Sequence, residues 1–244
     1  MTVLILAGSG EARHIAKYCA DHNITALASL AGLTRQPIRL ALPTRCGGFG
    51  GADGFRSYLK KHDIKAIVDA THPYANHITH RSFIIAQEMD VPLLRFERPQ
   101  WEPIEGDHWV NLADESEAHN HIMNDETVFL ATGRQSLQKF ANLSHARLFC
   151  RQIDPPDTSF PWPNGDYVVG RPPFSIASEV ALFRRLKVDV LVVKNAGGSA
   201  SRTKLDAARI LGISVLMIAR PSRSGALSVQ TLQEVEEWLD RWKS

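Results

Sequence analysis

Short strand-like runs alternate with helical patterns along the chain, and this alternation restricts the fold more than any other feature. In the first part, strands are predicted at 3–7, 25–29, 66–70 and 92–95, and helices at 12–21, 54–61 and 78–89. Such alternation is typical of parallel strands joined by helices. The sequence therefore predicts an α/β fold built on parallel sheets.

A Pro-rich, acidic segment interrupts the pattern. Residues 97–107 contain two prolines and four acidic residues with little periodicity, which indicates a linker. A second series follows, with strands predicted at 109–112, 128–131, 147–151, 188–193 and 214–219, and helices at 115–123, 175–186 and 203–211. We therefore predict two domains, residues 1–97 and residues 98–244.

A last helix is predicted over 231–242, because apolar residues recur there at helical spacing. We assign this helix to the second domain. Open α/β sheets bind ligands at the carboxyl ends of their strands, so we expect the two sheets to face a shared cleft. Segment 154–173 is long for a connection between packed elements, and it is expected to form a rim loop or lid. A variable surface loop is the alternative.

Composition narrows the possible partners. The 244 residues are 44% hydrophobic and 22% charged, which is typical of a globular protein, and the formal net charge of +2 is too small to favour nucleic acid. No apolar run approaches the roughly 18 residues that span a bilayer, and no signal peptide is recognised, so we expect no membrane partner and a cytoplasmic location. The three cysteines and ten histidines show no metal-ligand spacing, so no metal is predicted.

The first strand leads into a glycine-rich turn that opens a helix. Gly8, Ser9 and Gly10 stand where backbone amides at a helix N-terminus can face a pyrophosphate. Arg13 occupies the position of the third small residue of the dinucleotide fingerprint, so the match is partial. The alternative is a tight turn without a ligand.

The end of the second strand lacks the acidic residue that an NAD site normally offers to the ribose hydroxyls. Ser29 and Thr34 supply hydroxyls there, and Arg35 follows directly. Such groups suit a 2′-phosphate, so the sequence favours NADPH over NADH. A solvated Arg35 is the alternative.

The third strand ends in the segment DATHPYA, residues 69–75, which brings several polar side chains to one strand end. His72 is a candidate general acid, an orienting group for the nicotinamide ribose, or a turn histidine bonded to the backbone. Tyr74 is a candidate proton donor or a half-buried aromatic residue.

Three more glycine-containing segments are candidate ligand contacts: one lies between the second and third predicted strands, and two follow strands of the second series. The segment Cys46–Gly51 allows close approach of the backbone to a flat ligand, with a flexible hairpin as the alternative. ATGRQ at 131–135 and KNAGG at 194–198 each place a cation at a strand end. Lys194 and Lys204 flank a glycine turn and a helix start, an arrangement suited to carboxylates.

Together these segments resemble the precorrin-6A reductases of corrin biosynthesis. The likeness covers almost the whole chain, and DATHPYA combined with RFERPQW at 95–101 is its most specific part. It also includes LAGSGEAR at 6–13, GGFGG at 47–51, ATGRQ, KNAGG and TKLDAARILGI at 203–213. Ala7 and Ser9 replace the usual glycine and threonine, and Ala196 replaces a common serine; these small-for-small changes affect hydrogen bonding rather than the expected activity.

The resemblance implies two Rossmann-like (flavodoxin-like) domains, NADPH bound mainly by the first, and a macrocycle rich in acetate and propionate groups as substrate. The cofactor is expected to contact Gly8, Ser9, Gly10, Ser29, Ala31, Gly32, Thr34, Arg35, Thr71 and His72. The substrate is expected to contact Gly48, Gly50, Tyr74, Arg98, Thr132, Gly133, Arg134, Lys194, Asn195, Gly197, Gly198 and Lys204. His72, Tyr74 and Lys194 are the candidate catalytic residues.

The expected reaction saturates one double bond of the ring in cobalamin biosynthesis, with a hydride from the nicotinamide and a proton added beside it. Neighbouring enzymes of the pathway are expected as transient partners. A cobalt-precorrin-6A reductase, a reductase of another anionic metabolite and a non-catalytic nucleotide- or tetrapyrrole-binding module are the alternatives.

Overall fold

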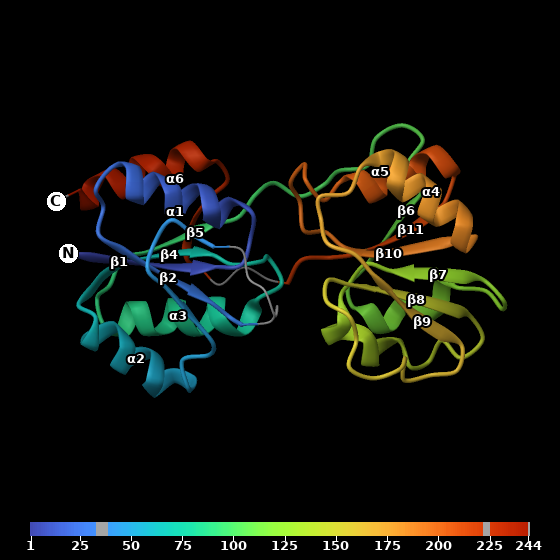
Figure 1. Cartoon of the computed structure of the whole chain (residues 1–244), viewed down its shortest axis with the longest axis horizontal. Coiled ribbons are helices and arrows are strands. Elements are labelled where there is room, and N and C mark those ends of the chain that lie inside the picture. The colour runs from blue at the N-terminus through green and yellow to red at the C-terminus, as the bar shows by residue number, and fades with distance from the viewer. Residues whose placement is uncertain (33–38, 222–224, 244) are drawn as a thin grey trace. The chain divides into compact units, whose positions relative to one another are not determined.

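The computed structural model describes residues 1–32, 39–221 and 225–243. It divides into two units (Figure 1). Unit 1 comprises Met1–Pro99 and Pro221–Ser244, and unit 2 comprises Gln100–Arg220. Each unit contains a six-stranded sheet in which all pairings are parallel, which confirms the predicted α/β class.

The sheet of unit 1 has the strand order β12-β5-β4-β1-β2-β3. Its strands are β1 (Thr2–Ala7), β2 (Ala26–Leu30), β3 (Thr44–Cys46), β4 (Ile64–Ala70), β5 (Leu93–Phe96) and β12 (Leu227–Val229). Read from β3, the order is that of a Rossmann fold, with β12 in the sixth place. Successive strands are therefore added in one direction from β1 to β3 and in the opposite direction from β4 to β12. This reversal of the strand order falls between the neighbours β1 and β4.

Helices cover both faces of this sheet (Figure 1). They are α1 (Glu11–Asp21), α2 (Gly51–Lys61), α3 (Asn76–Glu88) and α6 (Leu232–Leu239), which η3 (Asp240–Trp242) extends. Alternate residues of β1 point to opposite faces: Val3 and Ile5 pack in the core beneath α1 and α6, whereas Leu4 and Leu6 pack in the core beneath α2 and α3. Burial on both faces explains why the central strands are continuous apolar runs.

Unit 2 repeats this arrangement with the order β6-β11-β10-β7-β8-β9. Its strands are β6 (Trp109–Leu112), β7 (Thr127–Leu130), β8 (Arg147–Gln152), β9 (Gly165–Val169), β10 (Val190–Lys194) and β11 (Ser214–Ile218). Its helices are the 3₁₀ helices η1 (Glu115–His121) and η2 (Arg134–Phe140) and the α-helices α4 (Ile176–Leu186) and α5 (Thr203–Leu211). Here the order reverses between β7 and β10.

The C-terminal segment lies in unit 1, whereas the sequence analysis placed its helix in the second domain. Strand β12 pairs with β5, and Val235, Trp238 and Leu239 of α6 are buried in the core that also holds Ile15 of α1. In unit 1 the strand next to β5 at the sheet edge is therefore β12, which follows unit 2 in the chain, whereas the corresponding edge strand of unit 2 is β6, the first strand of that unit.

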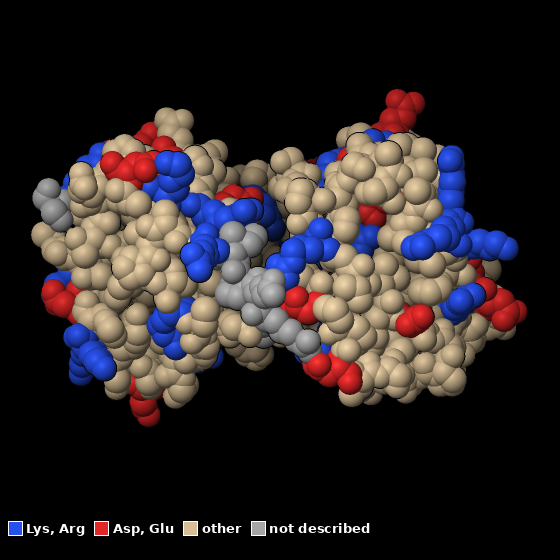
Figure 2. All heavy atoms as spheres, viewed as in Figure 1, with Lys and Arg blue, Asp and Glu red and all other residues tan. Residues whose placement is uncertain are grey.

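The predicted loop 154–173 is also only partly a loop. Residues Gly165–Val169 form β9, which pairs with β8 at the edge of the sheet. On the face drawn in Figure 2, basic and acidic side chains are interspersed over each unit, as the small formal net charge implies. None of the helices in residues 1–32, 39–221 and 225–243 is long and apolar enough to cross a membrane.

Candidate functional site

The turns that follow β1 and β4 lie side by side in unit 1, at the point where the strand order reverses. Gly8 approaches the β4 turn so closely that an added Cβ would lie 3.4 Å from the backbone N of His72 and from Cα of Thr71. An added Cβ at Gly10, by contrast, would have no atom within 4 Å. Ser9 Oγ accepts a weak hydrogen bond from the Ala12 amide at 3.4 Å. The turn therefore has one packed glycine and one open glycine, as a dinucleotide fingerprint requires.

An ion pair neutralises the acidic residue at the start of α1. Arg98 Nη1 lies 2.9 and 2.8 Å from the two carboxylate oxygens of Glu11. Burial raises the pKa of Glu11, but the hydrogen bond and charge of Arg98 outweigh it, so the net shift is downward. A negative charge in this first turn would repel a phosphate. Pairing with Arg98 reduces that repulsion, a role that the sequence analysis did not foresee for this residue.

A buried network holds the β4 turn in place. Asp69 is fully buried at the end of β4, and its Oδ1 accepts hydrogen bonds from the Thr71 amide at 3.0 Å and the Thr71 hydroxyl at 2.7 Å. Arg95 of β5, also buried, lies 2.7 Å from the same carboxylate oxygen and donates to Thr71 Oγ1 at 2.8 Å. It also reaches the His72 carbonyl at 3.5 Å. Thr71 is thus fixed by two strands.

His72 and Tyr74 lie together in this turn, with ring centroids 5.7 Å apart. The Tyr74 amide donates to His72 Nδ1 at 3.3 Å, which places the proton of a neutral imidazole on Nε2. The Ala75 amide also donates to the His72 carbonyl at 2.8 Å. Nδ1 therefore serves the turn, and only Nε2 has the orientation to donate a proton elsewhere.

Near the end of β2, Ser29 is buried and its hydroxyl accepts a hydrogen bond of 2.8 Å from Arg45 of β3. Arg45 also bonds the carbonyls of Gly47 and Gly48, both at 2.8 Å. Gly32 lies against Gly47, whose N would be 3.4 Å from an added Cβ. The GGFGG segment, predicted to contact the substrate through Gly48 and Gly50, therefore lies beside the predicted cofactor residues of β2.

The exposed residue Ala31 follows the same strand. Thr34 and Arg35, two further predicted cofactor contacts, lie outside the described residues.

In unit 2 the order reverses between β7 and β10, and a row of polar residues lies there. The register places Lys194 at the end of β10, and the Thr132 position follows β7 beside it. Lys194 Nζ lies 3.2 Å from Glu115 Oε1 and 3.3 Å from Ser136 Oγ. Gly133 has φ 81° and leads into η2 at Arg134, which is exposed. The ATGRQ and KNAGG turns thus meet at one strand-end edge.

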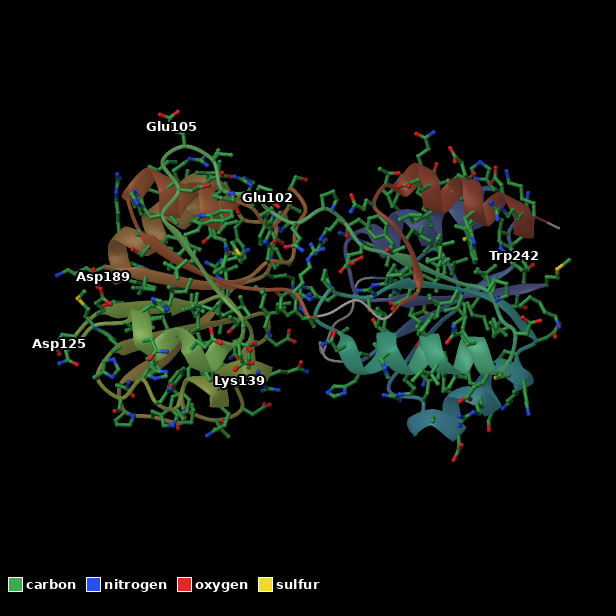
Figure 3. All side chains as sticks on the ribbon, turned by 180° about the vertical axis from the view of Figure 1, so that it is seen from behind. Glu102, Glu105, Asp125, Lys139, Asp189 and Trp242 are labelled. Atoms are coloured by element: carbon green, nitrogen blue, oxygen red, sulfur yellow. The ribbon has the colours of Figure 1, made fainter. Side chains whose placement is uncertain are left out.

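Glu115 joins three elements of unit 2. It is buried in η1, bonds Lys139 of η2 at 2.9 Å through its second oxygen, and reaches Lys194 of β10. Burial raises its pKa, but the hydrogen bonds and charges of the two lysines lower it below the ordinary value. Figure 3 shows Lys139 on the side of the sheet that η1 and η2 cover. The sequence analysis did not identify Glu115, because an acid in a polar helix has no distinguishing pattern.

The KNAGG turn is held by Trp101. The Asn195 side chain is buried and pairs with the Trp101 backbone, accepting from its N at 2.8 Å and donating to its O at 3.0 Å. The Trp101 indole donates to the Gly198 carbonyl at 2.7 Å, and Lys204 Nζ lies 5.2 Å from the indole ring centroid. Gly197 and Gly198 both have positive φ. The side-chain amide of Asn195 therefore shapes the turn by pairing with the backbone of Trp101.

Two buried polar atoms at this edge have no hydrogen-bond partner among the described residues. They are Thr132 Oγ1, just after β7, and Gln152 Nε2, at the end of the neighbouring strand β8. A surface hollow lined by His145, Arg147 and Asp166 lies at the other edge, where β8 and β9 begin. Asp125 and Asp189 mark that same edge in Figure 3. The two unsatisfied atoms, Thr132 Oγ1 and Gln152 Nε2, favour a ligand at the carboxyl ends of β7 and β8.

The fold and the two strand-end clusters define a class: an α/β protein of two Rossmann-like units, the first of which has the geometry of a dinucleotide site. The chain matches the family described as Precorrin-6x reductase CbiJ/CobK over residues 2–240. It is 45% identical to the Precorrin-6A reductase of Rhodococcus erythropolis over 221 residues, 90% of this chain and 89% of that protein. The chain therefore belongs to the precorrin-6x reductase family.

Solved and curated relatives agree with this placement. The structure titled "CobK precorrin-6A reductase" superimposes with a TM-score of 0.95 at 35% identity, covering 100% of this chain and 98% of that one. The Cobalt-precorrin-6A reductase of Priestia megaterium is 28% identical over 247 residues, 96% of each chain. The protein is thus an oxidoreductase of corrin metabolism, and its fold and family indicate a nicotinamide cofactor.

Proposed function

We propose that this protein reduces precorrin-6A to precorrin-6B with NADPH, as a step of cobalamin biosynthesis. One observation carries the proposal: four of the segments that carry the family resemblance, LAGSGEAR, DATHPYA, ATGRQ and KNAGG, fall at the strand-order reversals of the two units, the usual position of a ligand in open α/β sheets. In unit 1 these are the turns after β1 and β4, and in unit 2 the turns after β7 and β10.

The residues of unit 1 fit a dinucleotide. At Gly10 the space that a Cβ would fill is open, and an 11-residue helix begins directly after it, an arrangement that suits a pyrophosphate. Gly8, Ser9 and Gly10 would hold the phosphates, while Ser29 and Gly32 would border the adenosine ribose. Thr71 and His72, fixed by Asp69 and Arg95, would orient the nicotinamide ribose.

Unit 2 offers groups that suit an anionic macrocycle. Lys194 and Arg134 supply charge at the strand-end edge, and Lys204 begins α5 nearby in the same unit. Thr132 and the glycines at 133, 197 and 198 provide hydroxyl and backbone groups. Tyr74 and Arg98 of unit 1 remain proposed contacts, although Arg98 already pairs with Glu11. Guanidinium and ammonium groups are natural partners for acetate and propionate carboxylates.

When bound, the cofactor supplies the hydride that saturates one double bond of the ring, and a proton must be added at the adjacent carbon. The protein's part is to orient the two reactants, exclude water and bring that proton. We propose His72 Nε2 or the Tyr74 hydroxyl as the donor, because Nδ1 of His72 is bonded to the turn. Glu115 and Ser136 hold the Lys194 side chain at the proposed substrate edge.

The test is oxidation of NADPH by the purified protein in the presence of precorrin-6A. We expect loss of NADPH absorbance that depends on the macrocycle and coincides with a change in its spectrum, and slower turnover with NADH. Binding of both ligands without NADPH oxidation would contradict the proposal and favour a non-catalytic binding module.

The cobalt-containing ring is the second candidate substrate. The metal-free ring is favoured because the relatives named Precorrin-6A reductase reach 45% identity, whereas the first one named for the cobalt form reaches 28%. Turnover of cobalt-precorrin-6A faster than precorrin-6A would reverse this assignment. A cytoplasmic location and contact with neighbouring pathway enzymes remain predictions, which fractionation and co-purification from the native host test.

A further inference from the structure

A guanidinium is built into the edge of unit 1 where a dinucleotide places its adenosine ribose. Arg45 lies on β3 directly beside Ser29 of β2 in the parallel register. In Rossmann-like sheets the end of the second strand borders the ribose and decides between a 2′-hydroxyl and a 2′-phosphate. Here Leu30, Ala31 and Gly32 follow Ser29, so the described residues at this strand end include no acid to bind a hydroxyl.

The Arg45 side chain is held rigidly. Its Nη1 donates to the Ser29 hydroxyl and the Gly47 carbonyl, and its Nη2 donates to the Gly48 carbonyl, all at 2.8 Å. Its Cζ lies 4.1 Å from the ring centroid of Phe49 and 5.3 Å from that of Tyr58. A guanidinium fixed on three acceptors and an aromatic ring loses little entropy when it binds an anion.

The charge of Arg45 is not neutralised by any carboxylate in the described part of the chain, since no ion pair there includes it. Arg56 on α2 differs in this respect, because Asp53 and Glu88 pair with it at 2.9 and 2.6 Å. The three acceptors around Arg45 use three of the five N–H groups of a guanidinium, which leaves the N–H of Nε and one of Nη2 for a further acceptor. Arg45 is half-buried, so this edge reaches the surface.

We propose that Arg45 is the residue that selects a 2′-phosphorylated adenosine, and so makes the protein specific for NADPH over NADH. The inference rests on the proposed use of a nicotinamide cofactor and adds the group that chooses between its two forms. Ser29 acts as a positioning residue: its oxygen accepts from Arg45, so its own proton points to an acceptor elsewhere. The GGFGG segment then serves the cofactor side, because its carbonyls clamp the guanidinium.

Calorimetry with two small probes tests this directly. Adenosine 2′,5′-bisphosphate carries the 2′-phosphate and adenosine 5′-monophosphate lacks it, and neither needs a substrate or turnover. We expect the wild-type protein to bind the bisphosphate about tenfold or more tightly than the monophosphate, because a bidentate guanidinium–phosphate contact is charge-assisted. Arg45→Ala should lower the affinity for the bisphosphate by about 10- to 100-fold and the affinity for the monophosphate by less than about twofold.

Matched variants separate specificity from folding. Arg56→Ala removes another arginine of unit 1 that is already paired, and it should leave the affinity for both probes unchanged. Arg45→Lys keeps the charge without the planar fork and should retain part of the preference, which decides the matter if Arg45→Ala does not fold. The assignment would be overturned if a folded Arg45 variant bound both probes less tightly by the same factor, or if its affinity for the bisphosphate were unchanged.

Kinetics of the whole protein distinguish this inference from the proposed reaction. Arg45→Ala should raise the KM for NADPH and leave the KM for precorrin-6A unchanged; the reverse pattern would show that Arg45 holds a macrocycle carboxylate and would overturn the inference. A wild-type protein that prefers the bisphosphate but never oxidises NADPH with precorrin-6A would instead contradict the reaction and leave Arg45 in its role.

Discussion

At the residue scale, the groups that hold the candidate site are as informative as those that face it. Asp69 and Arg95 are both buried, and neither would be tolerated in a core without its partner. Their shared contact with Thr71 fixes the turn that carries His72. The buried ion pair therefore holds this turn rigidly at the nicotinamide end of the proposed cofactor site.

Removing one member of this pair should destabilise the protein strongly. We expect Arg95→Leu to lower the free energy of unfolding by about 3–5 kcal/mol, because Asp69 would be left buried and unpaired. Denaturant unfolding gives this quantity. Lys17→Ala breaks the exposed pair with Asp21 and should change it by less than about 1 kcal/mol. Equal effects of the two substitutions would contradict this account of the network.

The strand-end motifs were predictable as positions, but their contacts were not. A glycine-rich turn after a strand identifies Gly8 and Gly10 from the sequence, because the chemistry resides in the backbone. Arg98 was predicted to hold a carboxylate of the substrate, and in unit 1 it pairs with Glu11, 87 residues away in the chain. Arg45 and Glu115 depend in the same way on partners that only the folded chain brings near.

At the scale of elements, the central strands, the edge strand β6 and the long helices follow from the sequence, and the other three edge strands do not. Strands β1, β7 and β10 are nearly continuous apolar runs because helices cover both faces of their sheets. Strands β3, β9 and β12 are short and largely exposed, so they lack the apolar pattern that marks a strand. Their pairing is decided by the neighbouring strand.

Helix α6 shows why order along the chain is a poor guide to the domain in which an element packs. Leu239 is fully buried against unit 1, so Leu239→Ala should lower the free energy of unfolding by about 2–5 kcal/mol through lost contacts and a cavity. Leu227→Ala, at a leucine of β12 that is 65% exposed, is the control and should change it by less than about 0.5 kcal/mol. A small effect at Leu239 would argue against the packing of α6 on unit 1.

The link between η1, η2 and β10 predicts a pH dependence. The pKa of Glu115 is lowered below its ordinary value of 4.5, so its contribution to stability is complete above that value and is lost as pH falls through the lower folded pKa. The difference in unfolding free energy between wild type and Glu115→Gln should therefore be constant from about pH 7 to about pH 5 and shrink as the pH falls further toward about pH 3.

Glu105→Gln, at an exposed glutamate labelled in Figure 3, is the control for this titration. A wild-type advantage over Glu115→Gln that stays constant across the same pH range would contradict the ionic role of Glu115.

At the scale of the whole molecule, the two sheets have the same strand order, but the groups that lie at their strand-order reversals differ in chemistry. Unit 1 offers an open glycine turn and a half-buried guanidinium, which suit a dinucleotide. Unit 2 offers cations at two turns, which suit carboxylates. We therefore propose that the cofactor binds to unit 1 and that the macrocycle binds mainly to unit 2.

Steady-state kinetics of Gly10→Ala and Lys194→Ala, with NADPH and precorrin-6A each varied in turn, test which unit binds which ligand. Gly10→Ala places a methyl group in space with no protein atom within 4 Å, so it should leave stability unchanged and raise the KM for NADPH roughly tenfold without affecting that for precorrin-6A. Lys194→Ala should raise the KM for precorrin-6A by a similar factor and leave that for NADPH unchanged. Equal effects of either substitution on both KM values would contradict the division between the units.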